Sequence, residues 1–553
     1  MTLFPIFKLK IYLMRKILTL VSAICITGSL FAGGLVTNTN QSASWVRLPA
    51  RDASTSIDAV YYNPAGLMKL ENGFHISISN QYITQHKEVE NFYTGPGGLY
   101  GLNESLYKGK VSAPVFPGVY AAYKADRFAV SFGFNPIGGG GGATFEKGLP
   151  SFEMTPSDLV PSLASQGAKA YRLDTYFEGT SVYFGFQGGV SYKINDFISV
   201  AAGVRYVTAK NTYNGYLRDI ELNMGTAETP AWTRADAIMT GISNQAKAGG
   251  DGLVPIINAG GGGFTADQLV AASMITTDQR NAIVNGLTAL GVSNAAALTI
   301  NQSQTAFYGK QAVYLGTATL LGDQEADVEQ TGSGYTPFIS VNLTPVENLN
   351  IGIKYEMATK LELENKTAKD IKVGFTGEGV PVTMFPDGEK VRNDMPAMLA
   401  LGVDYGVTEK LNIAAGAHYY FDKPANYGHK LNGVYVDNDM IIDKNYYELS
   451  AGLQYKINNF ILVSGGYLFS KTGVNDNYQS DLTYSLTSHT GGIGGAVKLL
   501  DNLELNLGFA YTYYLDGEKT INHLFTPTSA VIPARETYFK DTMIIAAGID
   551  FSF

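Results

Sequence analysis

The 553-residue chain has almost no cysteine and little charge. Its single cysteine, Cys25, lies in an apolar N-terminal segment, so the rest of the chain can form neither disulfides nor cysteine-ligated metal sites. The 40 Lys and Arg against 49 Asp and Glu give a net charge of -9, and basic runs are scarce. Nucleic-acid binding needs a basic footprint, so we expect no nucleic-acid partner.

Long apolar runs are also missing after residue 32. A membrane-crossing helix needs about 18 consecutive apolar residues, and no later segment offers them. The N-terminus differs, because Met14-Arg15-Lys16 is followed by an apolar stretch at 17–30 and a small-residue cleavage site at Ala32. We predict that residues 1–32 contain a signal peptide and that Met14 is the true start of translation. A lipoprotein anchored at Cys25 is the alternative, although Ile24 stands where a small residue is preferred.

The residue constellations of an enzyme are absent as well. The histidines are scattered singly along the chain, as His75, His86, His418, His429, His489 and His523. None lies in a hydrolase motif, and no spacing of metal ligands is visible. His418 falls on the inward face of a predicted strand, where a plain polar wall residue is the simpler interpretation. We therefore predict a protein that is not an enzyme and that uses neither a metal nor a cofactor.

What the chain has in abundance is aromatic residues and glycine, with 35 Tyr, 28 Phe and 62 Gly. Aromatic side chains favour strands and membrane-interface girdles, and glycine permits tight turns. The C-terminal segment alternates strictly, with one face formed by Met543, Ile545, Ala547, Ile549, Phe551 and Phe553. An end on Phe553 resembles the signal that the barrel-assembly machinery reads on bacterial outer-membrane proteins.

Similar segments recur along the chain and predict a transmembrane antiparallel β-barrel. The predicted strands cover residues 73–88, 115–124, 128–135, 180–194, 197–213, 334–343, 349–363, 394–407, 411–422, 446–457, 460–471, 484–499, 503–513 and 543–553. Short turns at 125–127, 195–196, 344–348, 408–410, 458–459 and 501–502 alternate with long connections. Tight periplasmic turns opposite long extracellular loops indicate an all-β outer-membrane barrel of about fourteen strands.

The longest connection, at 223–326, has helical signals of its own. Thr265 with Gln268, and Thr276 with Gln279, read as capping boxes ahead of apolar positions. A loop of this length without structure would be unusual, so we predict short helices in the extracellular loops. They either shape a surface groove or only cap the barrel.

The predicted inward faces are mostly small and neutral. Mid-strand positions include Gly185, Gln187, Gly189, Ala201, Gly203, Ala400, Gly402, Ala414, Gly416, Gly508, Ala510, Ala546 and Gly548. Such residues leave space for a plug or a ligand. A lumen poor in charge favours an apolar guest over sugars or ions, which would lose their hydration without compensation.

Residues 33–71 precede the first predicted strand and contain Asp58-Ala59-Val60-Tyr61-Tyr62-Asn63-Pro64-Ala65-Gly66-Leu67. This segment resembles the hatch of the long-chain fatty acid outer-membrane transporter family, the FadL/TodX group. The resemblance implies that residues 33–71 form an N-terminal hatch inside a barrel at 72–553, with a gating turn at Asn63, Pro64 and Ala65. A disordered leader is the alternative, although the segment is more apolar than disordered chains usually are.

A second feature lies in the third predicted strand, where Asn135-Pro136 is followed by glycine from Gly138 to Gly142. Proline removes a ladder donor and glycine supports no regular pairing, so the strand should break or kink at Asn135, Pro136, Gly138 and Gly139. In the family that the chain resembles, such a kink opens the wall sideways. The alternative is that an extracellular loop simply begins here.

The resemblance implies a passive, hatch-gated channel in the Gram-negative outer membrane, present as a monomer among outer-membrane lipids. Long-chain fatty acids are the leading substrates and aromatic hydrocarbons the alternative, with lateral release into the membrane as a further expectation. The substrate-binding residues are not identifiable from the motif. An adhesion or binding protein that works through its long loops is the rival from another class.

Overall fold

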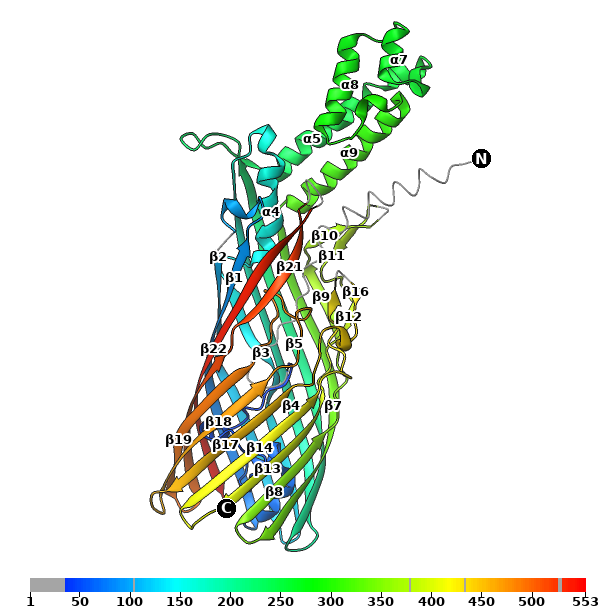
Figure 1. Ribbon diagram of the computed structural model, residues 1–553. Coiled ribbons are helices and arrows are strands. Elements are labelled where there is room, and N and C mark those ends of the chain that lie inside the picture. Colours follow the sequence, from blue (N-terminus) through cyan, green and yellow to red (C-terminus); the bar gives the residue numbers. More distant parts are fainter. Residues whose placement is uncertain (1–34, 103–104, 377–378, 432–433, 526–529) are drawn as a thin grey trace, which may run out of the picture.

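A closed antiparallel β-barrel of 14 strands forms the body of the computed structural model, which describes residues 35–102, 105–376, 379–431, 434–525 and 530–553. The strands are steeply tilted, and helices crown the upper end (Figure 1). The first strand pairs with both the second and the last, in a register that runs from His75 opposite Ser552 to Tyr93 opposite Ala534, and this pairing closes the barrel. The predicted signal peptide lies outside the described residues.

The wall strands follow one another in chain order, and some are split in two. They are β1 (Gly73–Tyr93), β2 (Ser105–Ala125), β3 (Phe128–Phe145), β4 (Ala170–Lys193), β5 (Ile198–Asn223), β7 (Gln324–Val346), β8 (Leu349–Glu356) with β9 (Glu362–Lys369), β12 (Lys390–Arg392) with β13 (Ala397–Gly406), β14 (Leu411–Phe421), β17 (Tyr447–Lys456), β18 (Ile461–Lys471), β19 (Ser488–Leu500), β20 (Leu503–Tyr514) with β21 (Gly517–Phe525), and β22 (Ala530–Ser552). Small strands lie in the connections, as β6 (Trp232–Arg234), β10 (Lys372–Phe375), β11 (Pro381–Thr383), β15 (Lys430–Leu431) and β16 (Val434–Tyr435). Each predicted strand lies in the wall and each predicted short turn joins two wall strands, so the expected barrel is confirmed.

The wall is much taller on one side than on the other. β5 has 26 residues, whereas β13 has 10. The predicted ends of the first and fifth strands, at residues 88 and 213, are wrong because both strands continue to the mouth. Above the membrane the outer face no longer needs apolar side chains, so the alternation fades while the backbone pairing continues.

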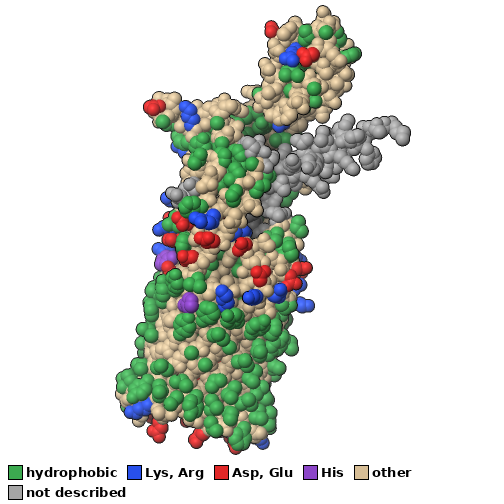
Figure 2. Space-filling model, viewed as in Figure 1, with side chains coloured by type: hydrophobic (Ala, Val, Ile, Leu, Met, Phe, Trp, Pro, Cys, Tyr) green, Lys and Arg blue, Asp and Glu red, His purple; other side chains and the backbone are tan. Residues whose placement is uncertain are grey.

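The lower outer wall is covered by exposed apolar side chains, and a belt of Lys, Arg, Asp and Glu lies above them (Figure 2). Exposed aromatic residues mark the turn end of this band at Phe74, Tyr123, Phe128, Tyr192, Phe197, Tyr405, Tyr455, Phe460 and Phe553. Others mark its upper edge at Tyr82, Tyr206, Tyr335, Tyr419, Tyr467 and Tyr511. An apolar band between aromatic girdles is what a barrel needs to span a bilayer. The protein is an outer-membrane β-barrel.

Residues 35–70, which we call the hatch, fill the lumen within this band. They form α2 (Ala43–Arg47), α3 (Ala59–Tyr62) and the 3-10 helix η1 (Pro64–Lys69). Trp45 and Val60 are essentially inaccessible and belong to one apolar cluster with Ile83 and Ile544 of the wall. The expected hatch inside the lumen is confirmed.

Helices gather at the mouth, as Figure 1 shows. They are α4 (Pro150–Ser162), α5 (Ala235–Asp251), α6 (Val254–Asn258), α7 (Ala266–Ala271), α8 (Thr277–Ala289) and α9 (Ile300–Leu321), with the 3-10 turns η2 (Gly98–Tyr100), η3 (Ala164–Gln166), η4 (Gly261–Gly263) and η5 (Ala295–Ala297). A further 3-10 turn, η6 (Asn438–Met440), lies in the connection between β14 and β17. Within the described ranges, no helix combines the length and apolar character that crossing a bilayer requires.

Both predicted capping boxes are present, at Thr265 and Thr276, and a third begins α9 at Thr299. The expected helices of the long connection are confirmed, and the longest of them, α5 and α9, have 17 and 22 residues. These two pack along each other and carry the smaller helices at their far end, so the long connection forms a projecting helical arm (Figure 1).

Candidate functional site: the lumen and its hatch

Glycines on the inner wall form the surface on which the hatch rests. A Cβ atom at Gly352 or Gly402 would overlap the hatch backbone at Asp52. At Gly492 it would overlap the carbonyl of Val46. Only glycine allows two backbone segments to approach this closely. The small inward residues predicted from the alternation therefore make room for a plug in this structure.

The predicted gating turn is held by serine hydroxyls from neighbouring wall strands. Ser191 donates to the carbonyl of Pro64 at 2.7 Å, and Ser199 donates to the carbonyl of Ala65 at 2.8 Å. The Ala65 amide donates to the hydroxyl of Ser340 at 3.1 Å. Asn63 is fully buried beside them. The turn is thus fixed to β4, β5 and β7 by hydrogen bonds.

The lumen carries buried charges, so the expectation of a charge-poor interior is wrong. Arg205 of β5 and Glu356 of β8 form a bidentate ion pair with N–O distances of 2.7 and 2.8 Å. The ammonium of Lys354 lies 2.5 Å from the same carboxylate. Arg205 and Lys354 are 2% and 1% exposed, so both cations are withdrawn from water. The two cations can be buried because both are paired with the carboxylate of Glu356.

These wall charges also bind the hatch. Lys354 donates to the carbonyl of Tyr61, and the guanidinium of Arg205 lies 4.9 Å from the centre of the Tyr61 ring. Gln187, which accepts from Arg205 at 2.7 Å, donates to the carbonyl of Val60. Helix α3 therefore sits directly on the charged cluster.

A second buried ionic contact joins the hatch to a neighbouring part of the wall, two strands from β8. The ring of His418 bridges Asp52 of the hatch, at 2.6 Å, and Glu448 of β17, at 2.8 Å. All three side chains are inaccessible or nearly so. His418 is therefore not a plain wall residue: it fixes the hatch to β14.

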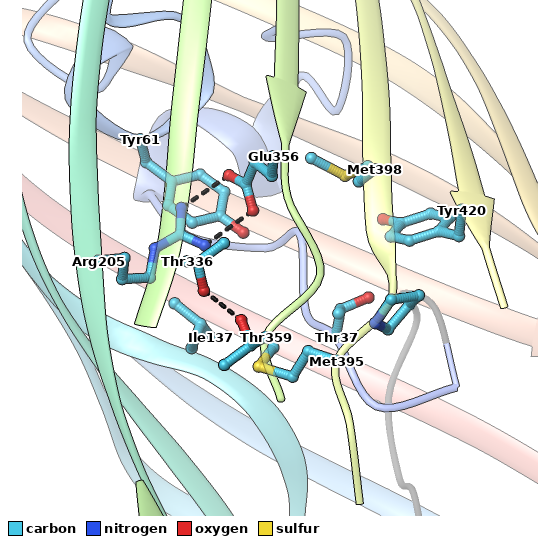
Figure 3. Close-up of a pocket in the computed structure, with 11 residues that line it drawn as sticks. Thr37, Tyr61, Ile137, Arg205, Thr336, Glu356, Thr359, Met395, Met398 and Tyr420 are labelled. Atoms are coloured by element: carbon cyan, nitrogen blue, oxygen red, sulfur yellow. Dashed lines mark hydrogen bonds and ion pairs between the residues drawn. The ribbon is translucent and has the colours of Figure 1, made fainter. Parts of the chain in front are cut away.

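A small cavity lies between the hatch and the charged cluster (Figure 3). Its walls combine the Arg205–Glu356 pair with apolar side chains, among them Ile137, Met395 and Met398. The cavity measures about 10 Å³, room for about one water molecule. Tyr61 of the hatch forms one wall, so the space for a larger guest depends on the position of the hatch.

The third strand departs from regular pairing where the sequence predicted a break. β2 and β3 are in register up to Val119 opposite Phe134 and again from Val111 opposite Ala143, and the residues between do not pair with each other. The pairing of β3 with β4 shifts at Gly138. However, β3 runs to Phe145, so the predicted strand end at residue 135 is wrong. Backbone pairing with β4 resumes beyond the irregularity and keeps the strand extended.

The start of the hatch occupies this interruption. Thr37 forms a bridge with Gly138, and Asn38 donates from its amide to the carbonyl of Ile137 at 2.8 Å and from its side chain to Gly139 at 3.1 Å. Gln41 donates to the carbonyl of Pro136 at 3.0 Å and accepts from Asn135. The predicted break therefore contacts the first residues of the hatch, whereas the predicted gating turn contacts β4, β5 and β7; the structure does not bring the two groups together.

No protein-family model matches the chain, and no curated protein matches it in sequence. Solved structures do match in shape. A FadL homologue from Pseudomonas aeruginosa has a TM-score of 0.55 at 12% identity and covers 95% of this chain and 100% of its own. The toluene transporter TodX from Pseudomonas putida has a TM-score of 0.50 at 14% identity and covers 94% of this chain and 100% of its own. The chain has the FadL/TodX fold. The resemblance inferred from the hatch motif is thus confirmed for the architecture of the whole chain.

Proposed function

We propose that this protein is a passive outer-membrane channel through which hydrophobic small molecules, long-chain fatty acids first among them, enter the cell. The observation that carries the proposal is the cavity of Figure 3, which sets the guanidinium of Arg205, ion-paired with Glu356, beside apolar side chains inside a hatch-filled barrel. An amphiphile with an anionic head and an apolar tail matches both parts of that lining. The similar FadL and TodX structures support the broader class of hydrophobic guests.

The charges favour fatty acids over hydrocarbons. The guanidinium of Arg205 lines the cavity. It offers a carboxylate a partner where its loss of hydration would otherwise be costly. A hydrocarbon would gain nothing from this group.

Gating follows from the size of the cavity. A fatty acid cannot fit into about 10 Å³, so binding requires the hatch to shift. The turn at Asn63, Pro64 and Ala65 is the proposed gating element, because its bonds to Ser191, Ser199 and Ser340 tie hatch movement to the wall.

Lateral release is the proposed exit. The stretch of β3 at Asn135, Pro136, Gly138 and Gly139 does not pair with β2 and is covered from inside by the hatch. A guest that displaces residues 37–41 would reach the outer leaflet without crossing water. The chemical gradient and later consumption of the guest would drive the flow.

The remaining expectations complete the proposal. Residues 1–32 direct export as a signal peptide, residues 33–71 act as the hatch domain, and the strand ending at Phe553 engages the barrel-assembly machinery. The channel works as a monomer in the outer membrane and has no enzymatic step.

The likeness to TodX supports an aromatic hydrocarbon as the second candidate guest. The helical arm α5–α9 supports the rival class, an adhesion or binding protein.

Uptake of labelled oleate and labelled toluene tests the proposal in cells that lack their own hydrophobic channel. The wild type is compared at matched outer-membrane levels with Asn63→Ala/Pro64→Gly, Arg205→Met and the exposed control Arg535→Met. We expect oleate uptake to fall in the first two variants and to persist in the control. Toluene uptake that survives Arg205→Met would favour the hydrocarbon. Uptake of neither guest by the wild type would contradict the channel and favour adhesion.

A further inference from the structure

Two lysines face each other on the inner wall above the hatch. Lys87 of β1 and Lys540 of β22 are direct partners in the antiparallel register, so their side chains lie on the same face of the sheet. Lys87 is 2% exposed and Lys540 is partly buried. Like charges placed directly opposite each other destabilise a sheet, and burial adds the cost of lost hydration.

The outer face of the same two strands shows the usual arrangement. His86 and Asp541 are also direct partners, and their side chains lie 3.1 Å apart as a complementary pair. On the inner face, in contrast, each ammonium lies over an aromatic ring: Lys87 is 4.5 Å from the centre of Tyr484, and Lys540 is 4.5 Å from that of Tyr514. Across the described ranges, neither lysine has an ion pair with a carboxylate.

Nearby carboxylates are engaged elsewhere. Asp481 accepts from the amides of Ser151 and Leu482, both at 2.9 Å, and burial raises its pKa. Glu536 accepts from the hydroxyl of Tyr538 at 2.7 Å. The lysine pair therefore has no carboxylate in direct contact, and burial lowers the pKa of both side chains, that of Lys87 to about 7.

The lysine pair lies between the hatch and the mouth of the barrel. Ile83 and Ile544 belong to the apolar cluster around the hatch, whereas Val89 and Tyr538 belong to a separate cluster that joins the upper wall strands to residues of the connections. Lys87 and Lys540 lie between these levels on the same strands. A guest that moves from the mouth to the hatch passes this boundary.

We propose that Lys87 and Lys540 form an anion-binding site for the carboxylate head of an amphiphile on its way to the hatch. The inference rests on the proposed function and adds a second binding site along the path of the guest. At the lower cluster Glu356 already bonds both cations, while the upper pair has no such competitor. A carboxylate between the two ammonium groups would remove their repulsion, and the rings of Tyr484 and Tyr514 would border the first part of its tail.

Equilibrium binding of labelled oleate and of uncharged labelled methyl oleate to the purified full barrel in neutral detergent tests the site. Charge-assisted hydrogen bonds of this kind predict that Lys87→Met/Lys540→Met weakens oleate binding by about tenfold or more. Methyl oleate binding should be unchanged, and Lys110→Met, an exposed lysine on β2, should behave as the wild type. Lys540→Met alone, at the less buried position, gives the same test should the double variant fail to fold.

The outcomes are distinguishable. Unchanged oleate affinity in a folded variant would overturn the lysine site and leave the proposed channel intact. A wild type that binds neither lipid would remove both. Inorganic phosphate provides the third arm: binding of phosphate that depends on the lysines, without any effect of the variants on oleate, would assign the pair to a free anion and overturn the carboxylate-head proposal.

Discussion

The two sides of the hatch meet the barrel wall in different ways. Toward β13–β20 the wall is a continuous ladder lined with glycine, and the hatch backbone lies flat on it, fixed by the buried contact of Asp52 with His418. Toward β2 and β3 the ladder is interrupted, and residues 37–41 replace the missing strand contacts with a few neutral hydrogen bonds.

The difference predicts which side of the hatch would open first. A buried ionic contact costs several kcal/mol to break, whereas a neutral hydrogen bond costs about 1 kcal/mol. Residues 37–41 can therefore leave β3 while the rest of the hatch stays on its glycine surface. Release on the β3 side would uncover a gap in the wall, and release on the other side would only unseat the plug.

The largest expected effect comes from His418→Leu. Removal of the ring leaves Asp52 and Glu448 buried without their shared partner, which should destabilise the hatch by about 3–5 kcal/mol. Hydrogen exchange of residues 43–69 in the detergent-solubilised barrel would measure the local opening. His489→Leu is the control, because that histidine is partly exposed at the outer wall beside Tyr467. Equal protection in both variants would contradict the role of His418.

The next effect tests the glycine surface itself. Gly492→Val would drive a side chain into the carbonyl of Val46, at a cost of about 3 kcal/mol. The neighbouring Gly491 has nothing within 4 Å of an added Cβ atom, so Gly491→Val is the matched control on the outer face. Urea unfolding should show reduced stability only for Gly492→Val. A similar loss in both variants would mean that strand propensity, not hatch contact, selects glycine on β19.

The same comparison shows how far the sequence alone could reach. Strands and turns were predictable because one wall face meets lipid and alternation is strict there, and the capping boxes at Thr265 and Thr276 were readable because both partners lie three residues apart. The inward phase that predicted Gly203 also contains Arg205 two residues on, and it holds Lys354 and Glu356 on β8. Following the inward-facing alternate positions further along each strand would have identified these buried charged residues.

Their partners were beyond the reach of pattern analysis. Asp52 and His418 are separated by 366 positions, and Arg205 and Glu356 by 151, so no local spacing links them. The course of β3 was misjudged for a related reason. A glycine run predicts a strand end when only neighbours in sequence are considered, yet the hatch supplies hydrogen bonds from residues about a hundred positions earlier, such as Asn38 to Gly139 with a separation of 101.

A smaller effect should follow on the interrupted side from Gln41→Ala. Loss of the amide leaves Asn135 and the carbonyl of Pro136 without their partner, at about 2 kcal/mol. Because the predicted mature chain has no cysteine, Ile137→Cys gives a single reporter at the gap. We expect Gln41→Ala to speed labelling of that cysteine by a lipid-soluble maleimide while residues 43–69 keep their exchange protection. Loss of protection throughout the hatch would show that both sides open together.

The smallest effect concerns the gating turn, which lies between the two sides. Ser340→Ala deprives the buried amide of Ala65 of its acceptor and should cost about 1 kcal/mol. Ser333, exposed on the outer face of the same strand, gives the control Ser333→Ala. If the turn couples the hatch to the wall, Ser340→Ala should lower the oleate uptake rate, in the same direction as Asn63→Ala/Pro64→Gly, because movement is then transmitted less well between wall and hatch. An unchanged rate, with the same loss of stability, would mean that movement begins at residues 37–41 and that the turn stays fixed to the wall during transport.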